Sequence, residues 1–343
     1  MNTPVEHTTE TFSFLGLLDR TFRLYREHFA IFVGAVAIVI IPFTIIQFLL
    51  SAWELSNVSS VSGLSRTAAA SQTSGAVLIA SIASLIILVI QSSLEIGAVT
   101  YLTSESYLGH PISIRQAFSD RRSRFSNVGC GYISLFLIIG VFSFVIGVAG
   151  LVFTPAFACF GVVAYIGIAA FVFLVPVLML ENVYTPLGVN RAWSLGKARF
   201  WTVVALYATL SLLVVLLNVA FSTVLRLLLV AVTGPLGIVP TLAVTTILGA
   251  IGAIFLTPIV PIGLTLLYHD TRNRLEGLDF ALQALGKPDA RPADVLSSVP
   301  KGGLVSKDWI NLGIIMAITI ILALLIAPTI TSLIQRLTPA FTP

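Results

Sequence analysis

Seven stretches of the chain are each long and apolar enough to cross a lipid bilayer, and this feature limits the fold more than any other. A helix needs about 20 apolar residues to cross a hydrocarbon layer of about 30 Å. Backbone groups cannot stay unpaired in lipid, and these stretches lack the alternation of barrel strands, so we expect helices. The stretches cover residues 29–52, 75–101, 127–152, 156–180, 200–231, 236–268 and 310–334.

Composition agrees with a location in the membrane. Hydrophobic residues make up 57% of the 343 residues and charged residues only 10%, whereas soluble domains carry about a quarter charged residues. The net charge of +4 is what cations at the ends of membrane spans produce, so we expect no nucleic-acid partner. Cys130 and Cys159 lie in apolar surroundings without ligand-like spacing, which argues against a disulfide or a metal site.

The positions of lysine and arginine predict the orientation of the chain, because cytoplasmic loops are enriched in both. Almost all of them fall before the first stretch, between the second and third, between the fourth and fifth, or in the segment 269–309. The exceptions are Arg66, Arg226 and Arg336. We therefore expect a cytoplasmic N-terminus and a C-terminus outside.

Three of these cationic segments share a pattern of aromatic and basic residues. Segments 20–29, 116–125 and 191–200 read RTFRLYREHF, QAFSDRRSRF and RAWSLGKARF. In each, an aromatic residue is followed by a cation four residues later and by phenylalanine three residues after that. This helical spacing suits short helices in the headgroup layer. The candidates for contact with lipid headgroups, which we expect to be anionic, are Arg20, Arg23, Arg26, Arg122, Arg191, Lys197, Arg272 and Arg274.

Two interpretations of this pattern remain open. The helices can be anchors that only set topology, or they can form a cytoplasmic collar around a lipid headgroup or a partner protein. In either case we expect an all-α integral membrane protein with a six-span core of three helical hairpins and interfacial amphipathic helices. The predicted parts are a cytoplasmic N-terminus with an interfacial helix (1–28), the membrane core (29–285), a cytoplasmic linker (286–309), a seventh span (310–334) and an outer tail (335–343).

Glu95 is the most informative ionisable residue within an expected span. A charge in lipid costs about 2.5–3.5 kcal/mol on insertion scales. Gln91 lies one helical turn before Glu95, so both side chains point the same way. Either the two residues face a water-filled cavity and bind a proton or a solute, or Glu95 pairs with an interfacial arginine that holds the bundle together.

The sixth apolar stretch ends in a charged segment, LLYHDTRNRLEGLDF at residues 266–280. Asp270 and Arg274 lie four residues apart, as do Arg272 and Glu276, so on a helix each pair can form a salt bridge. His269 beside Asp270 could serve proton transfer or metal binding, although an interfacial hydrogen bond is the commoner role. The chain contains no nucleophile-elbow, Walker, Rossmann or zinc-protease motif, so we expect no catalytic residue, cofactor or metal.

The same segment resembles a known family. Polytopic bacterial proteins similar to the membrane domain of glycerophosphoryl diester phosphodiesterases end their six-span core with the pattern Tyr-x-Asp-x-Arg-x-Arg-x-Glu-Gly-x-Asp. The segments FLGLLDRTFRLYREHF and LENVYTPLGVNRAWSLGKARFW resemble that family too. The resemblance implies a bacterial inner-membrane protein, and it covers residues 12–285. The residues that match the motif are Tyr268, Asp270, Arg272, Arg274, Glu276, Gly277 and Asp279.

The resemblance does not bring an activity with it. In full-length phosphodiesterases of this kind a separate soluble barrel performs hydrolysis, and the longest polar segment here, 269–309, is far shorter than the roughly 200 residues of a barrel. We therefore expect a non-catalytic membrane protein that works through lipids or through a partner protein at its cytoplasmic face. The competing classes are a transporter of a small solute or lipid with a site near Gln91 and Glu95, and a lipid-modifying enzyme that uses His269 and Asp270.

Overall fold

The computed structural model describes residues 13–60, 66–120, 122–152, 159–233, 238–287, 289–295 and 306–337, and these contain helices and no β-strand. Parts of the expected N-terminus, linker and outer tail, namely residues 1–12, 296–305 and 338–343, lie outside the described residues. The expectation of an all-helical protein is confirmed for the described part of the chain.

Within the described residues, 6 helical segments are long and apolar enough to cross a membrane. This number agrees with the expected six-span core. The segments belong to α2 (Phe29–Ser60), α3 (Arg66–Tyr107), α5 (Arg122–Val152), α6 (Phe160–Leu180), α8 (Phe200–Thr233) and the pair α9 (Ile238–Leu256) and α10 (Ile259–Glu276).

Each repeat of the aromatic and basic pattern lies where a short helix leads into a long one. Helix α1 (Phe14–Glu27) precedes α2, α4 (Ile114–Ser119) precedes α5, and α7 (Thr185–Ala198) precedes α8. The junction residues His28 and Arg199 have similar backbone angles, φ -118° and ψ 28° at His28 and φ -125° and ψ 37° at Arg199. These angles lie outside the α-helical region, so they end the short helix and redirect the chain.

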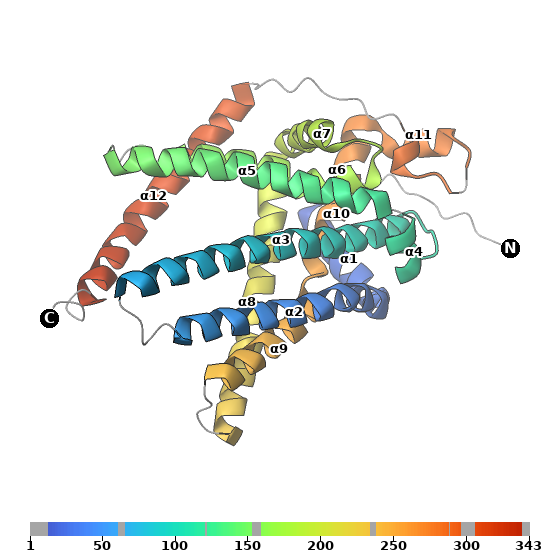
Figure 1. Cartoon of the computed structure of the whole chain (residues 1–343). Helices are drawn as coiled ribbons and strands as arrows, with labels where there is room; N and C mark the ends of the chain where they lie inside the picture. Colours follow the sequence, from blue (N-terminus) through green and yellow to red (C-terminus); the bar gives the residue numbers. More distant parts are fainter. Residues whose placement is uncertain are drawn as a thin grey trace.

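Consecutive long helices pack against each other, α2 on α3, α5 on α6 and α8 on α9. Helix α6 is the most buried of the 6 candidate spans among the described residues, and α10 packs on α1, α3, α6 and α8. Figure 1 shows α4 and α11 (Leu278–Ala284) at the end of the bundle where α3 ends and α5 begins. The short helices and the charged ends of the long ones therefore meet in one region.

The sixth apolar stretch is interrupted once, and the helix that continues it ends in a second change of direction. Helix α9 ends at Leu256, and Thr257 and Pro258 form a turn before α10 begins. Proline has no N–H to donate, which explains a break at this position. At the other end of α10, Gly277 adopts a left-handed conformation with φ 61° and starts α11 in a new direction. Glycine reaches this conformation without a steric penalty.

Helix α12 (Ser306–Leu337) covers the expected seventh span, and its first turns dock on the core. A Cβ atom on Gly161 of α6 would lie 2.7 Å from the Cα atom of Met316, so the two helices touch through their backbones. The Tyr165 hydroxyl donates to Asp308 Oδ1 at 3.2 Å, and Trp201 Nε1 donates to Asn311 Oδ1 at 2.9 Å. The start of α12 is therefore anchored by polar contacts as well as by packing.

Candidate functional site

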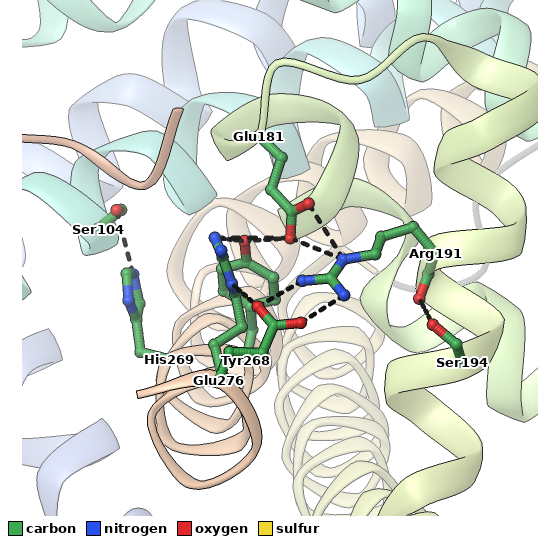
Figure 2. Close-up of polar contacts among 8 residues, drawn as sticks. Ser104, Glu181, Arg191, Ser194, Tyr268, His269 and Glu276 are labelled. Carbon is green, nitrogen blue, oxygen red and sulfur yellow. Dashed lines mark hydrogen bonds and ion pairs between the residues drawn. The ribbon is translucent and has the colours of Figure 1, made fainter. Parts of the chain in front are cut away.

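Five side chains from the end of α6, from α7 and from α10 form a buried ionic cluster, which Figure 2 shows. The Arg191 guanidinium donates to Glu181 Oε2 at 3.2 Å and to Glu276 Oε2 at 2.6 Å. The Tyr268 hydroxyl donates to Glu181 Oε1 at 2.8 Å, and Arg272 Nε donates to Glu276 Oε2 at 2.9 Å. Both arginine side chains are 0% exposed, so the cluster lies inside the protein.

The cluster combines two guanidinium groups with two carboxylates, so its formal charges balance. Burial alone would lower the pKa of Arg191, but its hydrogen bond with Glu276 and the charges of Glu181 and Glu276 raise that pKa above its ordinary value. Arg191 therefore stays protonated despite its burial. A buried charge is tolerated only when its partners replace the lost hydration, and each charged group here has at least one partner of opposite charge.

Asp270 joins the helix α10 to the start of α8. It forms ion pairs with Arg199 and with Arg274, whose Nε lies 3.1 Å from Asp270 Oδ1. The predicted salt bridges between Asp270 and Arg274 and between Arg272 and Glu276 are thus confirmed. The partners from other helices could not be seen in the spacing of the sequence.

Two further motif residues, Gly277 and Asp279, help to fix the end of α10. Asn273 Nδ2 donates to the Tyr107 hydroxyl at 3.1 Å and to Asp279 Oδ2 at 2.6 Å. The left-handed turn at Gly277 brings Asp279 back to this position. Farther along, Arg291 Nε lies 2.9 Å from Glu105 Oε1 at the end of α3. The start of the predicted linker is therefore tied to the core.

The prediction that Arg191 and Arg272 contact lipid headgroups is wrong, because both side chains are fully buried and ion-paired within the chain. Lys197 is also mostly covered, with a side chain 11% exposed and 3.5 Å from Asp308. The spacing of the aromatic and basic residues predicts that each segment is a helix with a basic face. It does not predict which face of that helix packs against the core. Arg20 is partly buried, whereas Arg23, Arg26, Arg122 and Arg274 are exposed.

His269 lies in the interior of the protein. Its ring is fully buried, Nε2 lies 3.1 Å from Ser104 Oγ, and the ring stacks on Tyr107 with centroids 4.5 Å apart. Figure 2 shows His269 pointing to Ser104 on the side away from Glu181 and Arg191. Asp270 is 2% exposed. Both groups proposed for a lipid-modifying enzyme are therefore enclosed by protein.

Glu95 belongs to a chain of polar side chains within the spans. It forms hydrogen bonds with Gln91 and Thr257, and Gln47 Nε2 donates to Gln91 Oε1 at 3.1 Å. Among the described residues the partners of Glu95 are Gln91 and Thr257 and include no arginine, which argues against one of the two interpretations, the pairing with an interfacial arginine. The predicted common direction of Gln91 and Glu95 is confirmed by their hydrogen bond. This row of polar side chains connects α2 and α3 to the break between α9 and α10.

A polar pocket of about 560 Å³, which we call the α1 pocket, lies between α1 and the end of α3. Its lining includes charged residues of both signs from α1, the ring of His28, and Tyr107. Arg20 lies over the Tyr107 ring, with Cζ 5.1 Å from the ring centroid. Arg23 forms an ion pair of 2.6 Å with Asp19. The pocket brings two of the predicted headgroup residues, Arg20 and Arg23, together.

Comparison of the chain with protein-family models, with curated proteins and with solved structures finds no match. The resemblance to the membrane domain of glycerophosphoryl diester phosphodiesterases therefore stays a prediction. The geometry of the motif is independent of it, and assigns the motif residues to contacts within the chain.

We predict that Arg191→Met destabilises the protein by about 3–5 kcal/mol, because Glu181 and Glu276 then lose a partner inside the protein. Thermal unfolding of the purified chain in detergent measures this effect. The control is Arg23→Met, which removes an exposed salt bridge and should cost about 0–1 kcal/mol. Equal losses in the two variants would show that the buried ionic cluster contributes no more than a surface pair.

Proposed function

We propose that this chain is a non-catalytic, multi-pass protein of a bacterial inner membrane, and that α1 binds anionic lipid headgroups at the cytoplasmic face. The observation that carries the proposal is the outward surface of α1. Leu17 and Thr21 anchor the helix in the core, whereas Leu15 is 74% exposed and Phe22 is 38% exposed. A helix that keeps large apolar side chains on its surface suits the boundary between headgroups and acyl chains.

The cations of α1 are placed to meet phosphate groups at that boundary. Arg23 and Arg26 are exposed beside Phe22, and Arg20 and Arg23 line the α1 pocket. Arginine binds phosphate through several donors of one planar group, and each basic residue near an anionic membrane surface contributes about 1 kcal/mol. Exposed apolar side chains and cations on one short helix thus favour anionic lipid over a neutral surface.

The non-catalytic part of the proposal rests on the accessibility of the charged groups. Arg191, Arg272 and His269 are all fully buried, and Asp270 is 2% exposed. Among the described residues no group of three His, Cys, Asp or Glu side chains could hold a metal ion. The charged residues that resemble a family motif therefore support the fold. We propose that a partner protein docks on the exposed cations of the same face.

The proposed topology has three hairpins, a seventh span in α12, a cytoplasmic N-terminus and a C-terminus outside. The packing of consecutive long helices favours the hairpins. Ion pairs that join the ends of α6, α8 and α10 favour a common side for the cationic segments.

We predict that a reporter that works only in the cytoplasm is active when it is fused after residue 28, 119 or 287. A reporter that works only outside the membrane should be active when it is fused after residue 337. Reporter activity on opposite sides for 28 and 119 would refute this topology.

We predict that replacing both Arg23 and Arg26 by glutamine weakens binding of phosphatidylglycerol by about fivefold for each cation removed. Native mass spectrometry of the full chain, titrated with this lipid in detergent, gives the apparent Kd. The control with the same charge change replaces Lys287 and Lys307, which are exposed but lie outside α1. The proposal fails if both double variants bind phosphatidylglycerol as the parent does, or if they weaken equally.

A second candidate function, transport of a small solute or of protons, has one observation in its favour. The polar chain of Gln47, Gln91 and Glu95 ends at Thr257, where the sixth span is broken. Interrupted helices often form the binding sites of transporters near the middle of the membrane. This row of polar side chains therefore places hydrogen-bonding groups between otherwise apolar helices.

We predict for transport that Glu95→Gln keeps the thermal unfolding midpoint in detergent but lowers proton flux by at least about tenfold, because the Glu95 carboxyl is replaced by an amide that cannot carry the proton. A pH-sensitive dye inside proteoliposomes measures the flux, and Glu27→Gln, an exposed acid on α1, is the control. Loss of folding, or flux equal to that of the parent, assigns Glu95 to structure and removes the transport hypothesis.

A further inference from the structure

The α1 pocket contains carboxylates as well as arginines, and binding of a phosphate group alone does not explain the carboxylates. Its lining from α1 includes Asp19 and Glu27 beside Arg20 and Arg23. Both acids repel a phosphate bound by the arginines, unless the ligand also offers hydrogen-bond donors to them. The acids therefore restrict which anionic lipids suit the pocket.

The two acids differ in what they already contact. Arg23 lies one turn after Asp19 and one turn before Glu27, and its Nη2 donates to Asp19 Oδ2 at 2.6 Å. The other N–H groups of this guanidinium remain for a ligand. Glu27 is exposed, and within the described part of the chain its carboxylate forms no hydrogen bond or ion pair. Because a carboxylate only accepts hydrogen bonds, Glu27 offers the pocket an acceptor for a donor group.

The spacing on α1 places this acceptor one helical turn from a cation that can bind phosphate. Residues four apart on a helix lie on the same face, with Cβ atoms about 5–6 Å apart. Arg23 and Glu27 have this spacing, and both line the pocket. In a phosphatidylglycerol headgroup the terminal hydroxyl follows the phosphate at a comparable distance. One such headgroup can therefore contact both residues.

The wall opposite α1 suits the same ligand. It includes Ser106, which adds a hydroxyl side chain, and Tyr107, whose ring centroid lies 5.1 Å from Arg20 Cζ. Leu266 of α10 adds an apolar surface. The volume of about 560 Å³ is within the range of pockets that hold small molecules, so the pocket accommodates a whole headgroup.

We propose that the α1 pocket selects, among anionic lipids, a headgroup that carries hydroxyl groups beyond its phosphate, as phosphatidylglycerol does. Arg23 binds the phosphate, and Glu27 accepts a hydrogen bond from a hydroxyl of the same headgroup. Helix α1 contains three arginines and two acids, so its net positive charge favours an anionic headgroup over a zwitterionic one. The inference rests on the proposed binding of anionic lipid at α1 and adds a specificity to it.

Two lipids of equal charge and identical acyl chains test the proposal. Phosphatidylglycerol and phosphatidylpropanol share the phosphodiester and differ only in the hydroxyl groups of the headgroup. Native mass spectrometry of the full chain in detergent gives the apparent Kd of each lipid. The parent should bind phosphatidylglycerol about fivefold more tightly than phosphatidylpropanol, which is the effect of about one net hydrogen bond.

Glu27→Ala removes the acceptor and should bring the ratio of the two Kd values to about one. The ratio is the readout, because loss of a negative charge affects the binding of both lipids alike. Asp289→Ala is the matched control and should keep the ratio of the parent, since Asp289 is an exposed acid outside α1 that does not line the pocket. Thermal unfolding shows whether each variant is folded.

Three results would overturn the proposal: equal Kd values for the two lipids in the parent, an unchanged ratio in Glu27→Ala, or a ratio that falls equally in Asp289→Ala. Tighter binding of phosphatidylethanolamine than of phosphatidylglycerol would overturn it as well, because the pocket would then prefer an ammonium group.

Failure of the proposed function gives a different result. In that case, replacing Arg23 and Arg26 leaves the Kd of phosphatidylglycerol unchanged. If these replacements weaken the binding of both lipids while the parent binds the two equally, anionic lipid binding at α1 stands and only the selectivity for hydroxyl groups is wrong.

Discussion

Charge neutralisation at the end of α6 is the constraint on which the rest of the structure depends. Helix α6 is the most buried candidate span in the described residues, so Glu181 at its end has little water around it. Its carboxylate needs cationic partners, and Arg191 of α7 and Arg272 of α10 supply them. The two arginines in turn need Glu276, and the set is complete only when three separate segments meet. The position of α7 and the path of α10 both follow from this requirement.

The sequence predicts the parts of this fold that depend on composition and short spacing. The length of each apolar stretch predicts a helix, and the fourfold spacing within residues 270–276 predicts the two salt bridges that form on α10. The short helices before α2 and α8 follow from the aromatic and basic pattern. In each case the relevant residues lie within a few turns of one another, where helical geometry alone decides which side chains meet.

Contacts between segments far apart in the chain could not be predicted from the sequence. Arg191 looks like a headgroup residue in its own segment, and only the approach of Glu181 and Glu276 shows that it is buried. The same holds for Glu95, whose partner Thr257 lies in another span, and for Arg291, which meets Glu105 across the linker. An apolar cavity of about 370 Å³ is lined by residues of α3, α5, α6, α8 and α10, so no single stretch of sequence predicts it.

The repeated junction at His28 and Arg199 has a consequence for how such a protein diversifies. Arg20 and Arg191 occupy the same place in their copies of the pattern, eight residues before the junction, yet Arg191 is fully buried and Arg20 lines an open pocket. The difference lies in the neighbouring side chains, because Arg191 forms an ion pair with Glu181 whereas Arg20 lies over the ring of Tyr107. One copy of a repeated sequence pattern can thus hold helices together through a buried ion pair, while another copy presents its arginine to a pocket where new contacts can form.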